Sequence, residues 1–177
     1  MPTHRDDGCN HFKFSSPVYT RSMSNAFMAR AIELAIENVS SRQGGPFGAV
    51  VVKDDKIIAE GANCVTLTND PTAHAEVVVI RKACATLGLF ELPGCELYSS
   101  CEPCPMCLGA IYWARPARVY YGSTAADAAK AGFDDSLIYD EIPQPHSERK
   151  IPMIKIMSDE ALEAFRAWER QPNKLPY

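Results

Sequence analysis

The stretch SCEPCPMCLG, at positions 100–109, restricts the possible folds of this chain more than any other, because it places three cysteines at intervals of three. Cys101, Cys104 and Cys107 have the spacing of a redox-active CxxC pair, of an iron–sulfur ligand run or of a zinc site. Each of these sites needs its sulfur atoms presented by a different combination of loop and helix. Residues elsewhere in the chain help to decide among them.

The three interpretations make different demands on the sequence. A redox pair would use Cys104 and Cys107 at the N-terminus of a helix. A bacterial ferredoxin run, C-x2-C-x2-C-x3-C-P, needs a fourth cysteine where this chain has Ile111, which weakens the cluster interpretation. A zinc site needs further nitrogen or sulfur ligands nearby in space, and His74 in the stretch TAHAE is a candidate.

TAHAE contains two groups suited to different tasks. His74 can bind zinc through a ring nitrogen, whereas Glu76 does not have the i,i+4 spacing of two ligands on one helix face. Both residues lie at an expected helix start, as do Cys104 and Cys107, so two positive helix ends would converge on one metal and favour thiolates there. We predict one zinc ion per chain, bound by His74, Cys104 and Cys107. Its fourth position would be open to water, as in catalytic zinc sites.

Strand-like and helix-like stretches alternate along the chain, which indicates an α/β fold. The expected strands are residues 49–53, 56–63, 95–100, 115–122 and 150–157, with a turn at Asp54-Asp55. The expected helices are residues 24–40, 71–87, 103–114, 123–132 and 159–170. We therefore predict a three-layer α/β/α sandwich around a mixed five-stranded sheet, with helices on both faces.

The composition sets limits on location and partners. Residues 1–22 lack periodicity, so we expect a flexible N-terminal arm ahead of a single domain at 23–177. The polar N-terminus is unlike a signal peptide, no apolar run suits a membrane span, and the odd count of seven cysteines favours reduced thiols in the cytoplasm. The net charge of -4 argues against a nucleic-acid partner.

The motif His74-Ala75-Glu76, followed by Pro103-Cys104-Pro105-Met106-Cys107, has the H-x-E…P-C-x-x-C form of zinc deaminases that act on nucleobases. The chain resembles the cytidine-deaminase-like superfamily. Within it, residues 25–177 are similar to the bacterial guanine deaminase group. That similarity is carried by the stretches GGPFGAVVVKD, NDPTAHAE, SCEPCPMCLGAIYWARP and AGFDDS and by the terminal tyrosine.

The resemblance implies a zinc-dependent hydrolysis that converts guanine to xanthine and ammonia. Glu76 would be the general acid–base that moves protons from water to the ring and to the leaving amine. Cys101 would pack below the metal without binding it. A closed structural site with Cys101 as fourth ligand is the alternative, although it leaves Glu76 without a role.

The resemblance also suggests residues that contact the substrate. Asn63 would hydrogen-bond the purine, and Asp135 would face ring N–H groups, while Phe47 and Trp113 would form apolar walls. Each has a simpler interpretation as well. Asn63 can be a turn residue at a strand end, Asp135 a solvated loop acid or helix cap, and Trp113 a core residue of a buried helix.

The resemblance further implies a homodimer whose chains exchange their C-terminal segments, residues 150–177. Pro143, Pro145 and Pro152 would stiffen an extended hinge. Tyr177 would then close the site of the partner. Alternatively, the segment folds back on its own chain and Tyr177 is frayed.

Other activities stay open from the sequence alone. Guanosine and amino-triazines present edges similar to that of guanine, so either could be the substrate. An RNA-editing adenosine deaminase shares the zinc motif. The alternative that is not an enzyme is a zinc-binding scaffold without activity.

Overall fold

The computed structural model of the chain describes residues 17–176, and the side chains of residues 25–176. Most of the expected N-terminal arm therefore lies outside the described residues, as does Tyr177. Helix α1 (Pro17–Ser40) begins earlier than the expected start at Ser24. Proline suits the first turn of a helix, because its missing N–H would have no intrahelical partner there.

The hairpin of β1 (Gly48–Lys53) and β2 (Lys56–Ala62) confirms the expected turn at Asp54-Asp55. Both aspartates have positive φ angles, 48° and 57°. This left-handed pair is the geometry of a two-residue turn whose twist matches the strands that it joins.

The sheet of the described residues has four strands in the order β2-β1-β3-β4. β1 pairs antiparallel with β2 and with β3 (Glu96–Cys101), and β3 pairs parallel with β4 (Arg118–Ser123), so the sheet is mixed as expected. The prediction of five strands is wrong, because residues 150–157 form no strand. Their apolar pattern suits a strand, but the segment is not paired with any edge of this sheet.

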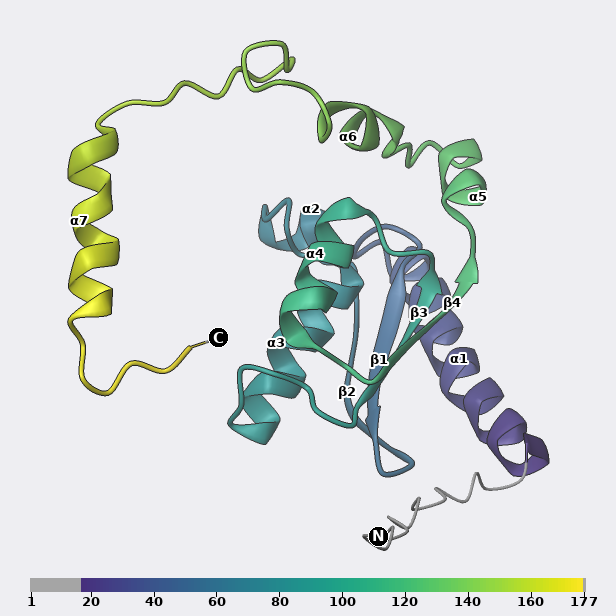
Figure 1. Cartoon of the computed structure of the whole chain (residues 1–177). Helices are drawn as coiled ribbons and strands as arrows, with labels where there is room; N and C mark the ends of the chain where they lie inside the picture. The colour runs from purple at the N-terminus through teal and green to yellow at the C-terminus, as the bar shows by residue number, and fades with distance from the viewer. Residues whose placement is uncertain (1–16, 177) are drawn as a thin grey trace, which may run out of the picture.

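Helices lie on both faces of the sheet (Figure 1). Alternate side chains of β1 point to opposite faces and pack against these helices. Val50 and Val52 point to the face covered by α1, where they join a small core around Ala31. Ala49 and Val51 point to the opposite face and join the larger core beneath α3 (Ala75–Leu87) and α4 (Pro105–Ala114).

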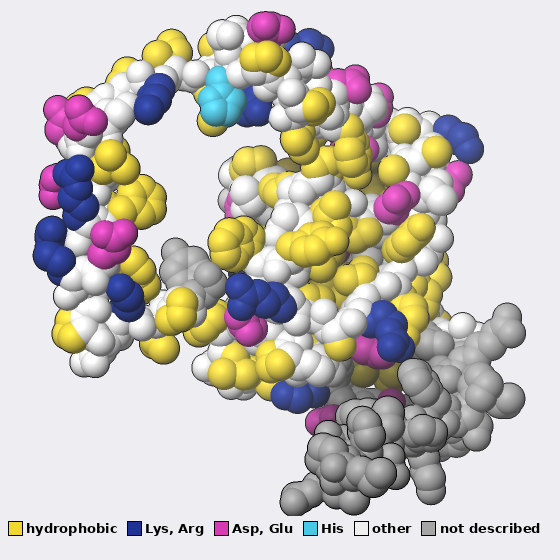
Figure 2. Space-filling view, viewed as in Figure 1, with side chains coloured by type: hydrophobic (Ala, Val, Ile, Leu, Met, Phe, Trp, Pro, Cys, Tyr) yellow, Lys and Arg dark blue, Asp and Glu magenta, His cyan; other side chains and the backbone are white. Residues whose placement is uncertain are grey.

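The last third of the chain leaves the sheet after β4 and forms an arc that ends in a helix standing apart from the body (Figure 1). Helices α5 (Ala125–Lys130), α6 (Ser136–Glu141) and α7 (Ser158–Glu169) contain no buried residue. Figure 2 shows hydrophobic side chains on the side of α7 that faces the body. No helix in residues 17–176 is long and apolar enough to cross a membrane.

Candidate active site

Two helix N-termini meet at the end of the sheet where the candidate metal ligands lie. His74 is the N-cap residue of α3 and Cys104 that of α4, and both have extended backbone angles. Cys107 follows in the first turn of α4, after Pro105 at a position that needs no N–H donor. The local sequence thus ends an extended segment and begins a helix at both ligand positions.

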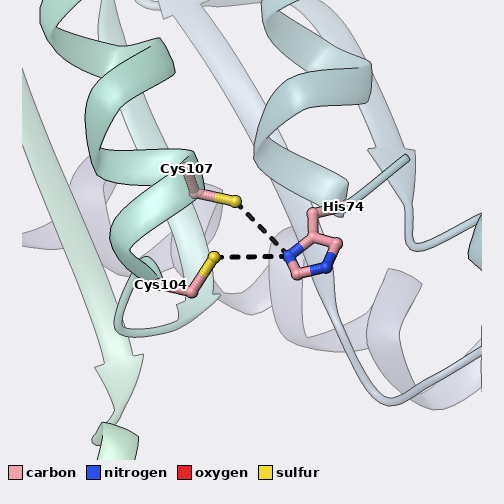
Figure 3. A group of neighbouring side chains, drawn as sticks. All are labelled: His74, Cys104 and Cys107. Carbon is pink, nitrogen blue, oxygen red and sulfur yellow. Dashed lines mark hydrogen bonds between the residues drawn. The ribbon is translucent and has the colours of Figure 1, made fainter. Parts of the chain in front are cut away.

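The three side chains point toward one another (Figure 3). The Nδ1 atom of His74 lies 3.5 Å from the Sγ atoms of both Cys104 and Cys107. Tetrahedral zinc, with its usual bond lengths, separates nitrogen and sulfur ligands by about 3.5 Å. Among the described residues, this is the one cluster of three metal-ligating side chains, so the donor set and its spacing fit a zinc ion.

The two sulfur atoms differ in acidity. Contact with Cys107 lowers the pKa of the Cys104 thiol to about 4, and the same contact raises the pKa of Cys107. The hydrogen bond to Cys104 in turn raises the pKa of the His74 imidazole. A thiolate at a helix N-terminus is the soft, anionic ligand that zinc prefers.

Glu76 lies beside the ligands without belonging to their set. Its side chain is buried, with 5% exposed, and it accepts hydrogen bonds from the Ser99 hydroxyl at 3.0 Å and the Cys107 thiol at 3.4 Å. Burial raises the pKa of the Glu76 carboxyl, while these hydrogen bonds oppose the rise. Burial thus makes this carboxylate more basic than a solvated one.

These groups lie on the wall of a cavity of about 400 Å³. His74, Glu76 and Cys104 line it, and so do three of the residues expected to contact a substrate: Phe47, Asn63 and Asp135. The walls come from the loop before β1, from the end of β2 and from the segment around α5 and α6. Folding therefore joins residues that are far apart along the chain.

Asn63 and Asp135, the two polar residues expected to contact the substrate, differ in their hydrogen bonds. Asn63 is buried, and its Oδ1 accepts a hydrogen bond from the backbone N–H of Val65 at 3.2 Å. Asp134 uses a carboxylate oxygen to cap the backbone of Ser136, whereas Asp135 makes no capping hydrogen bond at the start of α6. Burial raises the pKa of Asp135. Of the two acids, Asp135 is the one whose carboxylate is not used as a cap.

The two aromatic residues expected to contact the substrate, Phe47 and Trp113, lie in different surroundings. The ring of Phe47 packs edge-on against Phe133 at 5.0 Å between centroids, and both line the cavity. Trp113 does not line the cavity, and 63% of its side chain is exposed, so within this chain it is neither a pocket wall nor a core residue. Helix α4 is apolar around much of its circumference, and it is Ile111 and Ala114 that pack into the core.

Three residues of the site were not predicted from the sequence. Ser99 binds Glu76, Glu102 accepts a hydrogen bond from the backbone N–H of Ala125 at 2.9 Å, and Phe133 packs on Phe47. A signal existed for Ser99, because it is a polar residue on the inward face of a buried strand. Cys101 is buried and lines the cavity outside the metal cluster, as expected.

Sequence comparison assigns this combination of fold and site to a class. Residues 21–123 match the model of the cytidine and deoxycytidylate deaminase zinc-binding region. The chain belongs to this family of zinc-dependent deaminases.

Particular relatives extend the assignment beyond that region. Guanine deaminase of Bacillus subtilis is 60% identical over 151 residues, which cover 85% of this chain and 97% of the relative. The crystal structure of a Bacillus subtilis guanine deaminase superposes with a TM-score of 0.85 at 59% identity, covering 86% of this chain and 98% of that one. A tRNA-specific adenosine deaminase of Agrobacterium fabrum is 48% identical over 97 residues, 52% of this chain and 62% of the relative.

We predict that the purified protein contains one zinc ion per chain and that Cys104→Ser or Cys107→Ser removes most of it. The substitution deletes a thiolate ligand, and because metal binding is coupled to folding, the melting temperature should fall with the metal content. Elemental analysis and thermal unfolding measure both effects. Cys84→Ser, at a partly buried cysteine outside the cluster, should keep its zinc. Iron with acid-labile sulfide in the wild-type protein would contradict the assignment.

Proposed function

We propose that this protein catalyses the hydrolytic deamination of guanine to xanthine and ammonia. The observation that carries the proposal is the position of buried Glu76 beside the His74, Cys104 and Cys107 cluster, on the wall of a cavity that Asn63 and Asp135 also line. The similarity to a guanine deaminase over nearly its whole length supports the choice of base.

The reaction forms a bond between a water oxygen and C2 of guanine and breaks the bond from C2 to the exocyclic amine. Zinc held by His74, Cys104 and Cys107 would supply a Lewis acid that makes water a nucleophile near neutral pH. Glu76 takes a proton from the water, passes it to a ring nitrogen and helps to protonate the exocyclic amine, which then leaves as ammonia. Ser99 holds one carboxylate oxygen of Glu76 at 3.0 Å, which fixes the direction of the proton transfer.

The cavity walls provide the selection of the base. Asn63 lies where its amide can pair with the purine edge, and Asp135 supplies an acceptor for ring or amine N–H groups. Phe47 covers an apolar ring face. Such buried polar groups penalise a base with the wrong donors and acceptors, because they would be left unpaired.

An RNA-editing adenosine deaminase is the weaker candidate. It is favoured by the similarity to a tRNA-specific adenosine deaminase, but that similarity covers about half of this chain. Glu102, Asp134 and Asp135 line the cavity, and among the described residues no Lys or Arg does. A phosphate backbone at this entrance would meet negative charge.

Turnover of guanine, with Glu76→Gln as its matched variant, tests the proposal. The wild-type protein should release ammonia from guanine faster than from guanosine, cytosine, cytidine, adenine or ammeline, followed by ultraviolet absorbance. Glu76→Gln should keep zinc and fold but lose ~10² to 10⁴ in rate, because the amide cannot accept and return the proton. A Gln variant with half of the wild-type rate would remove Glu76 from the mechanism.

Asp135 should contribute to the choice of guanine. We expect Asp135→Ala to lower kcat/KM for guanine about tenfold or more, because the N–H groups of the bound base lose their acceptor. Asp140→Ala removes an exposed carboxylate from the same helix, away from the cavity, and should leave the kinetics unchanged. Unaltered guanine kinetics in Asp135→Ala would refute the assignment of this wall.

We further propose that the enzyme works in the cytoplasm as a homodimer whose chains exchange residues 150–177. The proposal is supported by apolar side chains that the chain itself leaves uncovered. Ile151 and Ile154 are each 82% exposed, and Phe165 is 67% exposed. A two-fold partner would cover them at low cost, and the extended segment 150–157 would then find a sheet edge. Tyr177 would lie against the site of the partner.

Complementation between two inactive chains tests the exchange. One chain carries Glu76→Gln with an intact C-terminus, and the other has an intact site but lacks residues 174–177. Each should be nearly inactive alone, and mixed dimers formed by refolding them together should regain activity, because the first chain lends its tail to the second. Mass spectrometry establishes that mixed dimers are present. If they are inactive, the tail acts within its own chain or not at all.

A further inference from the structure

One buried polar side chain near the site has no part in the chemistry proposed above. Asn38 lies near the C-terminal end of α1, with 6% of the residue exposed, and it does not line the cavity. An asparagine in a helix normally costs stability unless its amide finds partners. The partners of this amide indicate what it does.

The Nδ2 group of Asn38 donates two hydrogen bonds to two different walls of the cavity. It donates to the backbone carbonyl of Gly45 at 2.8 Å and to that of Asn63 at 2.9 Å. A side-chain amide nitrogen has two hydrogens, so its donor capacity is fully used. Gly45 and Asn63 both line the cavity.

Two backbone hydrogen bonds complete a closed circuit through these residues. The N–H of Phe47 donates to the carbonyl of Gly45 at 2.8 Å, and the N–H of Asn63 donates to the carbonyl of Phe47 at 2.9 Å. Asn38 closes the circuit from the other side. Two proposed substrate contacts, Phe47 and Asn63, therefore belong to one hydrogen-bonded unit that is fastened to α1.

The backbone at this junction is packed without spare room. A Cβ atom added at Gly44 would lie 2.3 Å from the carbonyl oxygen of Asn63 and 2.8 Å from Nδ2 of Asn38. Only a residue without a side chain allows the loop to approach Asn63 this closely. Any larger residue must push Asn63 or Asn38 away.

We propose that Asn38 is a positioning residue for substrate binding, which acts by holding Asn63 and the loop of Phe47 in register at the cavity wall. The role rests on the proposed function, because it assumes that these residues contact the base. Asn38 touches neither the candidate ligands nor Glu76, so its effect falls on binding of the base. A contact made equally in the ground state and the transition state changes KM and leaves kcat nearly constant.

Asn38→Leu tests the role by removing both donors at similar volume. We expect KM for guanine to rise about tenfold or more, with kcat within about threefold of wild type and zinc content unchanged. Ser40→Ala is the matched control, because it removes side-chain hydrogen bonds in the same helical turn that end on carbonyls of α1 itself. It should leave KM unaltered. Steady-state kinetics, elemental analysis and thermal unfolding are measured on the same preparations.

Gly44→Ala perturbs the same junction without altering Asn38, and it decides the question if Asn38→Leu fails to fold. It should raise KM in the same way, whereas Gly109→Ala, where an added Cβ meets no atom within 4 Å, should not. A lower melting temperature with unchanged KM in the folded variants would overturn the proposal, since a purely structural role moves stability alone. Failure of guanine as a substrate would be seen in the wild-type protein by itself.

Discussion

The N-termini of α3 and α4 must meet at one point, and the rest of the structure depends on that constraint. Two positive helix ends with unpaired N–H groups repel each other unless anionic groups lie between them. Cys104, whose thiol pKa is lowered, and the Glu76 carboxyl lie between them, and His74 lies within 3.5 Å of both sulfur atoms. The parallel pair β3 and β4, joined by α4, and the apolar core under α3 bring the two ends together.

The floor and the walls of the cavity are held by different kinds of force. The floor consists of helix starts packed on the larger core, so its geometry follows from rigid elements. The walls consist largely of loops, and hydrogen bonds from side chains to the backbone hold them in place. Asn38 fastens one wall at Gly45 and Asn63, and Glu102 fastens the other at Ala125. Loops in general vary more among homologues than the elements that they connect. We propose that the floor provides the chemistry and the walls provide the selection of the base.

The C-terminal third differs from the body in how it treats apolar surface. Helices α5, α6 and α7 bury no residue, although α7 has Leu162, Phe165 and Trp168 along one side. Leaving a contiguous set of large apolar side chains in water forgoes the main favourable term in folding. A second copy of the chain is the partner that we propose for this surface.

The sequence by itself determined those features whose signal is local. The hairpin was predictable because the turn at Asp54 and Asp55 is local, and both aspartates have the positive φ angles that such a turn needs. The metal cluster was predictable because the H-x-E motif at His74 and the P-C-x-x-C motif at Cys104 and Cys107 are each short, and their combination is typical of zinc deaminases. Only the tertiary structure decided the rest. The apolar pattern of residues 150–157 is the same whether or not a sheet edge is near, so the pattern alone does not decide whether they form a strand. The apolar circumference of α4 does not reveal that Trp113 faces outward. Asn38, Ser99 and Glu102 carry no motif, because their partners are backbone groups or side chains that folding alone brings within hydrogen-bonding distance.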